Sequence, residues 1–335
     1  MGIAGEELNQ QPAGSHPILM RKVALIYNPH SGRRRHHRRA DVEAVLGVLW
    51  EAGVEASATP TQSSADAPAQ VRAAIAQGCD TILACGGDGT VHDILQGIAG
   101  SDIALGVIPL GTANALAHDL NLPFRPAEAT RAALAALPRR VAVGRVEYRG
   151  LSGVPSSRFF LIAAGIGVDA HLFHKLDAGT KGRLGMAAYY AKAWHLWMTY
   201  EMRRFSVRCT ESESGNSRQA DVTELLAVRI RHFGGVLREL APGASLERND
   251  LRAVLCRTAS RISYLQYVTC RLLGLNWSVR GIDLAHCTRL ECAPLDLGEG
   301  VENKIYIEAD GELLGTLPAT ISVVPDALTL LMPSR

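Results

Sequence analysis

The sequence predicts an α/β fold in which a Rossmann-like domain with a parallel sheet is followed by a β-rich, sandwich-like domain. Up to about Pro138, apolar strand-like runs alternate with Ala-rich helical runs such as Ala40 to Ala52 and Asp66 to Gln77, a pattern typical of βα units. Beyond Pro138, short strand-like runs replace this alternation. The 335 residues exceed one average domain, so we expect two domains around separate cores.

Three strands predicted in the first domain each end in a turn of small and polar residues. The strands and their turns are Val23 to Tyr27 with Asn28 to Gly32, Asp80 to Cys85 with Gly86 to Thr90, and Ile103 to Ile108 with Pro109 to Asn114. A helix is expected after each turn, beginning near Arg38, Val91 and Ala115. The carboxyl ends of neighbouring strands form the crevice in which an open α/β sheet binds a nucleotide, so these turns predict such a site.

The turn Gly86, Gly87, Asp88, Gly89, Thr90 carries the most chemistry. Adjacent glycines allow backbone N–H groups to converge on an oxyanion, and the following helix N-terminus adds partial positive charge. A carboxylate repels phosphate unless a cation lies between them, so Asp88 indicates chemistry on a Mg²⁺-nucleotide. The alternative is a tight strand-to-helix turn in which Asp88 only caps the helix.

The second domain is predicted from eight short runs with strand character. They are Val141 to Tyr148, Phe159 to Ala164, Phe205 to Thr210, Leu225 to Ile230, Leu251 to Arg257, Thr288 to Ala293, Lys304 to Glu308 and Ala319 to Val324.

These residues resemble the diacylglycerol kinase catalytic-domain family of lipid kinases, which includes bacterial diacylglycerol kinases, sphingosine kinases and ceramide kinases. The resemblance covers roughly residues 22 to 333. Beyond the three turns it rests on Ala164 to Ala170, on the helix expected from Lys181 to Tyr190, and on the acidic segment Glu308 to Glu312. The Gly86 to Thr90 element alone is shared with NAD kinases and phosphofructokinase-like enzymes, whereas the ordered combination is specific.

The resemblance implies roles for individual residues. It implies ATP and Mg²⁺ as cofactors, with Asp88 acting on the metal through the Mg²⁺-nucleotide. Glu312 is then the base that accepts the hydroxyl proton, with Asp310 ordering the site, and the sphingosine kinase branch offers Asp88 as a rival base. The implied cofactor-binding residues are Asn28, Pro29, Ser31, Gly32, Thr61, Gly86, Gly87, Asp88, Gly89, Thr90, Gly111, Thr112 and Asn114.

Two departures from the family pattern matter. Many bacterial diacylglycerol kinases carry Asp where this chain has Ala115, and the run Asn114 to Ala117 looks more like the sphingosine and ceramide kinase version. The family also often has Asp followed by Gly in a loop that holds a structural Mg²⁺. Here Leu251 follows Asp250, so a second metal at Asp250 is only weakly indicated.

The domain limits combine these patterns. We expect a disordered tail at 1–20, the nucleotide-binding domain at 21–138, the lipid-substrate domain at 139–325, and a C-terminal segment at 326–335 that can return to the first domain. The composition, with 47% hydrophobic and 20% charged residues and a net charge of +2, is that of a globular protein. Seven cysteines without a C-x-x-C pair indicate free thiols in a reducing cytoplasm.

Membrane contact is the second theme of the sequence. The basic run Arg33 to Arg39 is open to three interpretations: a solvated helix start, contact with ATP phosphates, or attraction to anionic lipid. An aromatic stretch including Trp194, Trp197, Met198 and Tyr200 suits either packing or a bilayer interface. No aromatic residues interleave with the basic run, so nucleic acid is not an expected partner. A homodimer remains open.

The sequence as a whole predicts a cytoplasmic, peripherally membrane-associated, ATP-dependent lipid kinase whose acceptor is diacylglycerol, a sphingoid base or a related lipid. The alternatives are a soluble-substrate kinase, with NAD kinase first, and a catalytically silent lipid-binding protein of the same fold.

Overall fold

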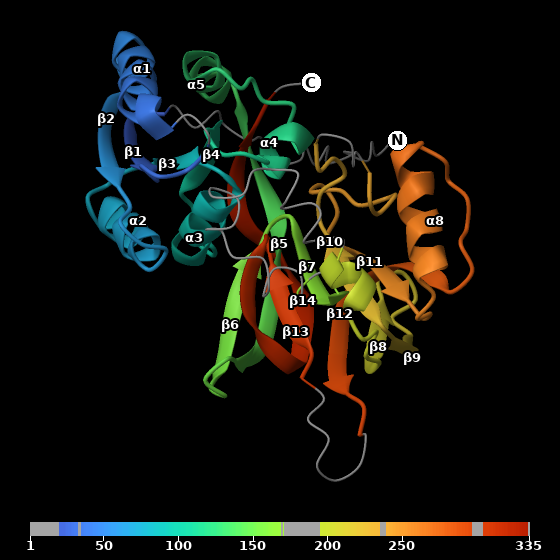
Figure 1. The fold of residues 1–335 in the computed structure, drawn as a ribbon. Helices are drawn as coiled ribbons and strands as arrows, with labels where there is room; N and C mark the ends of the chain where they lie inside the picture. Colours follow the sequence, from blue (N-terminus) through green and yellow to red (C-terminus); the bar gives the residue numbers. More distant parts are fainter. Residues whose placement is uncertain are drawn as a thin grey trace, which may run out of the picture.

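The computed structural model describes residues 20–32, 35–168, 170, 195–234, 239–296 and 304–333. Within these residues, fourteen strands form one continuous sheet that is parallel in the N-terminal part and antiparallel in the rest (Figure 1). The predicted α/β fold class with a β-rich second part is confirmed. The helix expected from Lys181 to Tyr190, together with Arg33, Arg34, Asp169 and Trp194, lies outside the described residues.

The N-terminal part is a helix-covered parallel sheet. Its strands pair in the order β2–β1–β3–β4. They are β1 (Lys22–Tyr27), β2 (Glu55–Pro60), β3 (Thr81–Gly86) and β4 (Ala104–Pro109). A 3₁₀ turn at Arg35–His37 leads into the first helix. The helices are α1 (Arg38–Glu51), α2 (Asp66–Ala76), α3 (Asp88–Ile98), α4 (Ala115–Asp119) and α5 (Pro126–Leu134).

Strand alternation explains why helices cover both faces of this sheet. Val23 and Leu25 of β1 belong to a core cluster with the buried side chains of α1 and α5. The intervening Ala24 and Ile26 point to the other face, into the cluster that contains α2 and α3. Successive strand residues face opposite sides, and a parallel sheet buries both. The carboxyl ends of β1, β3 and β4 are left for the predicted turns.

In the described residues the second part is made mainly of antiparallel strands. Helix α8 (Arg261–Leu272) lies between β11 and β12, and residues 195–199 are also helical. The strands are β5 (Leu137–Gly150), β6 (Pro155–Phe160), β7 (Ala163–Gly167), β8 (Phe205–Glu211), β9 (Ser217–Val222), β10 (Glu224–Val228), β11 (Leu251–Cys256), β12 (Ile282–Pro294), β13 (Tyr306–Ala309) and β14 (Glu312–Met332).

The long strand β14 joins the two parts. It pairs with β13 at its start, with β5 along most of its length, and in parallel with β4 near its end, where Thr329 lies opposite Ala104. One hydrophobic cluster accordingly contains Leu95 of α3 and Leu105 of β4 together with Val254 of β11 and Tyr264 of α8. Each part also has a core cluster of its own, one within residues 23–133 and one within residues 146–321, so the shared cluster joins two cores.

Two local expectations also differ from the structure. The run Phe159 to Ala164, expected as one strand, is split into β6 and β7 by Leu161 and Ile162, whose N–H groups donate to the Asp310 carboxylate instead of to a neighbouring strand. Helix α8 and strand β9 were not expected. None of the helices within the described residues is long and apolar enough to span a bilayer.

The expectation that all cysteines are free thiols is wrong. Cys209 of β8 and Cys287 of β12 form a disulfide between paired antiparallel strands. The other five cysteines are free and buried, so their thiols are shielded from solvent oxidants.

We predict that thiol titration of the denatured, unreduced protein gives five reactive groups and that prior reduction raises the number to seven. The Cys209→Ser, Cys287→Ser double variant should give five under both conditions. A value of seven without reduction would show that the two sulfur atoms are unbonded in the isolated protein.

Candidate active site

The three turns meet around a cavity of about 360 Å³. Most of its lining was predicted from the sequence. The predicted residues in it are Asn28, Ser31, Gly32, Thr61, Gly87, Gly89, Thr90, Gly111, Thr112 and Glu312. His30, Gln62, Ser63, Ser64 and Asp93 also line the cavity but were not predicted. Glu312 is the first residue of β14. The β-rich part of the chain therefore contributes one wall of a site whose other walls belong to the parallel-sheet part.

Arg38 fixes the first turn against the third. Its guanidinium donates to the carbonyl oxygen of Ser31 (2.5 Å) and to that of Leu110 (2.9 Å), and it lies 3.6 Å from the Asp41 carboxylate. Gly32 supports this closure, because its φ is +71° and a Cβ atom there would overlap the Leu110 carbonyl oxygen. Arg38 is buried, so this member of the Arg33 to Arg39 run does not face solvent or lipid.

The third turn packs directly on the glycine turn. A Cβ atom on Gly111 would lie 2.3 Å from Gly87 Cα, so position 111 requires glycine, and a Cβ atom on Gly87 would lie 3.1 Å from Gly111 Cα. The Asn114 side chain accepts the Gly111 N–H (2.9 Å) and donates to the Gly111 carbonyl (3.1 Å). Asn114 itself adopts a left-handed conformation with φ of 51°, which Asn tolerates better than most residues. These contacts hold the turn open towards the cavity.

Asp88 points away from this cavity. Its carboxylate accepts a hydrogen bond from the Leu116 N–H (3.4 Å) at the start of α4, and among the described residues it is not part of the cavity lining. Burial raises the pKa of Asp88, and the N–H groups of Ala115 and Leu116 partly oppose that rise. Asp88 is the first residue of α3, whose N-cap Gly87 has no side-chain cap bond, so Asp88 does not cap the helix that follows the glycine turn; its carboxylate lies instead at the N-terminus of α4.

Asp310 is the most highly coordinated carboxylate near the site. It accepts the N–H groups of Leu161 (3.0 Å), Ile162 (2.9 Å) and Ala163 (3.2 Å), and its Oδ2 lies 3.2 Å from His92 Nδ1. Burial disfavours a charged His92, but the hydrogen bond and the negative charge of Asp310 outweigh burial and raise the His92 pKa. With all its oxygen atoms in use, Asp310 is suited to ordering the site.

Asp310 also shapes the hairpin that presents Glu312. The φ angles of Asp310 and Gly311 are 50° and 85°, as in the two-residue turns that match the twist of antiparallel strands. The Gly311 N–H donates to Glu308 (2.8 Å). A Cβ atom on Gly89 would lie only 3.1 Å from Glu312 Oε1, so the Glu312 carboxylate lies directly over the glycine turn.

Asp93 is the acidic residue among the lining residues that were not predicted from the sequence. It stands one helical turn after Gly89 on α3 and lines the same cavity as Glu312. Burial raises the pKa of Asp93 to about 7, with His92 opposing the rise and Glu312 adding to it. Its position could have been predicted from the sequence, because Asp93 follows Gly89 by four residues and residues four apart on a helix share a face.

The donor atoms in the cavity fit Mg²⁺. Carboxylate and hydroxyl oxygens are the ligands that this ion prefers, and it is commonly held by one or two carboxylates together with substrate phosphates. Asp93, Glu312 and Thr90 supply such oxygens around the glycine turn. No cluster of three or more His, Cys, Asp or Glu side chains that could hold a metal ion occurs among the described residues.

Asp250, the weakly indicated second metal site, faces protein cations instead. Its carboxylate accepts hydrogen bonds from Arg248 (2.9 and 2.5 Å) and from the Ser212 hydroxyl (3.0 Å), and His286 Nδ1 lies 3.2 Å away. The guanidinium thus occupies the place where a cation was considered.

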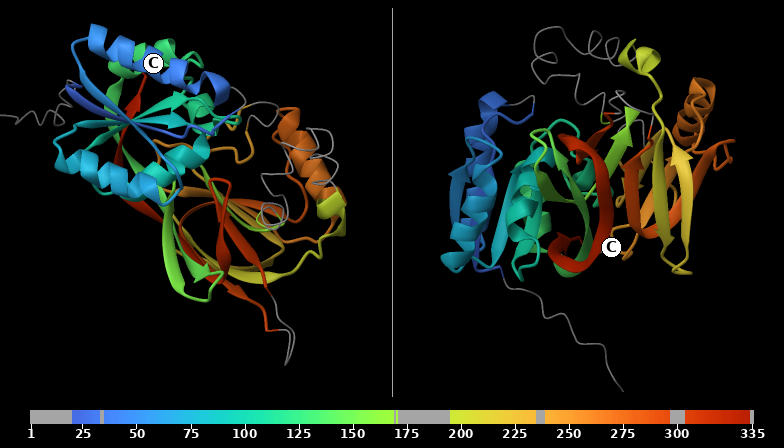
Figure 2. Two further views of the ribbon diagram at one scale, coloured as in Figure 1. Left: turned by 60° about the vertical axis from the view of Figure 1, so that its left-hand side comes forward. Right: turned by 90° about the horizontal axis from the view of Figure 1, so that it is seen from below.

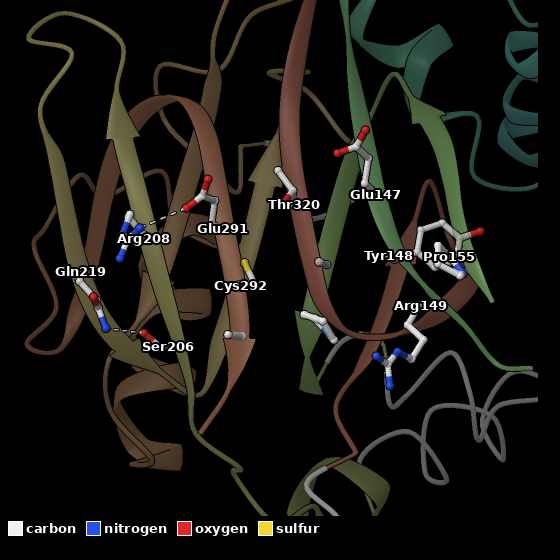
Figure 3. Close-up of a pocket in the computed structure, with 13 residues that line it drawn as sticks. Glu147, Tyr148, Arg149, Pro155, Ser206, Arg208, Gln219, Glu291, Cys292 and Thr320 are labelled. Atoms are coloured by element: carbon white, nitrogen blue, oxygen red, sulfur yellow. Dashed lines mark hydrogen bonds and ion pairs between the residues drawn. The ribbon is translucent and has the colours of Figure 1, made fainter. Parts of the chain in front are cut away.

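A second cavity of about 560 Å³ lies among the strands of the β-rich part and shares no lining residue with the first (Figure 3). Its walls carry the Arg208–Glu291 ion pair (3.5 Å) and the hydrogen bond from Gln219 to Ser206 (2.9 Å). These four polar side chains are therefore paired with one another.

The chain is similar to known kinases over nearly all of its length. Residues 22–146 match the Diacylglycerol kinase catalytic domain, and residues 163–332 match the YegS C-terminal NAD kinase beta sandwich-like domain. A protein named Diacylglycerol kinase from Bacillus subtilis is 27% identical over 322 residues, covering 94% of this chain and 98% of that protein.

Two solved structures show the same fold. The crystal structure of a diacylglycerol kinase from Bacillus anthracis has a TM-score of 0.69 and 22% identity, covering 93% of this chain and 96% of the other. Yeast NADH kinase complexed with NADH has a TM-score of 0.50 and 12% identity, covering 97% of this chain and 88% of the other. At these identities the likeness concerns the fold alone.

We predict that Asp93→Asn stabilises the protein at neutral and higher pH while impairing turnover. A raised carboxyl pKa means that the native state binds a proton which the unfolded state has lost, so wild-type stability falls as pH rises from about 4 to about 7. The variant avoids this loss. After allowance for solvent screening, we expect a gain of about 2 kcal/mol at pH 8 and almost none at pH 4.

Denaturant unfolding of both proteins across this pH range measures the effect. Asp80→Asn is a suitable control, because Asp80 instead accepts hydrogen bonds from the N–H groups of Arg21 and Lys22. Equal stabilities of wild type and Asp93→Asn at every pH would contradict the assignment.

Proposed function

Because the chain belongs to the family of the diacylglycerol kinase catalytic domain, we propose that it transfers the γ-phosphoryl group of ATP to a lipid hydroxyl with the help of Mg²⁺. The observation that carries this proposal is the position of Glu312, which the Asp310 hairpin holds over the glycine turn. A proton acceptor beside a phosphate-binding turn is what transfer to a hydroxyl requires.

Binding and positioning supply most of the catalysis in this proposal. The N–H groups of the turn at Gly87 and Gly89 and the N-terminus of α3 stabilise negative charge on the triphosphate. Asp93 and Thr90 would hold the Mg²⁺, which neutralises charge on the phosphoryl oxygens when it is bound. Arg38 and Asn114 keep the surrounding turns in place before the nucleotide arrives.

Glu312 is the proposed general base. Its carboxylate takes the proton of the lipid hydroxyl as the oxygen bonds to the γ-phosphorus, and ADP leaves with the electrons of the broken P–O bond. Asp88, the rival base, is turned towards the N-terminus of α4. Asp310 contacts four hydrogen-bonding groups and is not among the residues that line the cavity. These contacts support Glu312.

Diacylglycerol is the first candidate acceptor, since it is named for a relative that aligns with 94% of this chain. A sphingoid base is the second, favoured by Ala115. This residue is buried at the start of α4, directly before the N–H that binds Asp88. A bilayer-resident acceptor and an ATP donor lead us to propose peripheral contact with an anionic membrane on the cytoplasmic side.

We predict incorporation of labelled phosphate from ATP into lipid when the protein is offered diacylglycerol, monoacylglycerol, sphingosine, ceramide and NAD in separate assays. A signal with NAD alone would replace the lipid proposal by the soluble-substrate alternative. Absence of any product from a protein that binds Mg²⁺-ATP would support a silent lipid-binding protein.

Glu312→Gln is expected to retain nucleotide binding and lose about 10² to 10⁴-fold in kcat, the usual effect of removing a general base. The substitution is nearly isosteric. Within the described residues the Glu312 side chain accepts no hydrogen bond, so the change should not affect folding. Single-turnover rates with calorimetric titration of ATP separate chemistry from binding.

Asp310→Asn is the matched comparison. Its amide would place a donor against backbone N–H groups, so we expect a loss of about 3 kcal/mol in stability together with activity. If Asp310→Asn were to fold normally and lose all turnover while Glu312→Gln remained active, Asp310 would be the base.

Ala115→Asp tests the acceptor. Adding a charged acceptor beside Asp88 should shift the ratio of kcat/KM for diacylglycerol over sphingosine by roughly ten- to hundredfold towards diacylglycerol. Ala115→Asn separates charge from size. A ratio that neither substitution moves would mean that residue 115 has no influence on lipid choice.

A further inference from the structure

Helix α8 is fixed on the body of the protein by one face. Tyr264, Tyr267 and Cys270 are buried on that face. The Tyr264 hydroxyl lies 2.8 Å from the Thr223 hydroxyl, and the Tyr267 hydroxyl donates to the Leu240 carbonyl oxygen (2.5 Å). These bonds set the rotation of the helix and therefore decide which residues point outward.

The outward face of α8 carries no charged side chain. Its exposed residues are Ile262, Leu265, Gln266, Thr269 and Leu272. Ile262 is 78% exposed, and Leu273 and Trp277 in the following turn are 67% and 64% exposed. A surface helix normally turns charged and polar residues to water, so this face is unusual for a helix in contact with solvent alone.

The turn that carries Leu273 and Trp277 is held in shape by Arg271. The buried guanidinium donates to the carbonyl oxygens of Leu275 (2.6 Å) and Trp277 (3.1 Å) and to the Asn276 side chain (3.1 Å). These hydrogen bonds fix the turn in the conformation in which Trp277 is exposed.

Positive charge lies beside this apolar face. Residues 251–282 contain five arginines and no aspartate or glutamate. Beside the entry to α8 and the exit from its turn lies a cavity of about 590 Å³, whose lining includes Arg204, Arg257 and Arg280 with a single acid, Asp221. Arg257 is 3.4 Å from Asp283, and Arg280 is exposed. Three guanidinium groups around one cavity suit phosphate groups.

We propose that α8 and the Leu273 to Trp277 turn form the surface by which this protein docks on an anionic lipid bilayer, with the arginine cavity receiving lipid phosphate. This inference rests on the proposed function and names the membrane-facing surface of the same enzyme. Apolar side chains and a tryptophan beside arginines match the interface between headgroups and acyl chains.

The position of α8 favours a large flat partner. Figures 1 and 2 show α8 at the outer edge of the molecule, at the opposite end from α1. The basic run near α1 is a weaker candidate, since Arg38 is buried and Arg39 lies 2.9 Å from Glu43. A membrane also explains the charge pattern, which self-association of a basic, apolar face does not.

Vesicle sedimentation with the full chain tests the proposal. On vesicles of phosphatidylcholine containing one third phosphatidylglycerol, Trp277→Ala should weaken binding roughly tenfold, and Arg280→Gln about fivefold. Trp50→Ala and Arg72→Gln are matched controls on α1 and α2, since Trp50 is 59% exposed and Arg72 is also exposed. The controls should bind as wild type, and added salt should weaken wild-type binding.

Assays with a water-soluble short-chain diacylglycerol separate this inference from the proposed function. There Trp277→Ala should match wild type, while activity on vesicle-embedded lipid falls with binding. Unchanged vesicle binding by both variants, or equal wild-type binding to pure phosphatidylcholine, would overturn the proposal. So would a wild-type dimer, detected by light scattering, that Trp277→Ala converts to a monomer, because a second copy would then cover this face. Loss of the short-chain activity in wild type would instead count against the proposed function.

Discussion

The buried carboxylate of Asp310 holds together the three segments that make the candidate active site. It binds the backbone at the β6–β7 junction and the imidazole of His92 on α3, and it belongs to the hairpin that carries Glu312. Gln96, one turn beyond His92, strengthens this joint by exchanging two hydrogen bonds with the Phe159 backbone. Separating the segments would leave a buried charge without partners, which costs several kcal/mol. The distance between Glu312 and the glycine turn is therefore set by this joint.

The acidic side chains of the site are buried, and burial determines their pKa values. Burial raises the pKa values of both Asp88 and Asp93, and the raised pKa of His92 shows that a positive charge is favoured beside them. Neutralising Asp93 with a proton stabilises the folded protein, whereas binding a metal requires the ionised form. Ionised Asp93 thus lowers the stability of the folded protein, and a bound divalent cation would remove that cost. Functional sites commonly contain groups that destabilise the fold.

Features that depend on local sequence were predictable, and features that depend on distant contacts were not. Gly32, Gly111 and Asn114 predicted turns, because few other residue types fit the backbone at these positions. The division of β6 from β7 depends on Asp310, about 150 residues later in the chain, so no local pattern revealed it. Burial of Arg38 could not be predicted from the basic run, because it depends on the carbonyl oxygen of Leu110, which is distant in the sequence. Helix α8 escaped notice because apolar residues occupy both its faces, which blurs the helical period.

Continuity of the sheet would link the proposed membrane-docking surface to the candidate active site. Helix α8 lies between β11 and β12, and β12 pairs with β14, whose first residue is Glu312. The other end of β14 pairs with β4, which leads into the turn at Gly111. A surface fixed to a bilayer through α8 would therefore fix the orientation of both walls of the active site, because strands joined by ladders of backbone hydrogen bonds move as one body. Docking could then bring a lipid hydroxyl to Glu312 by orientation alone, without a hinge between the two parts.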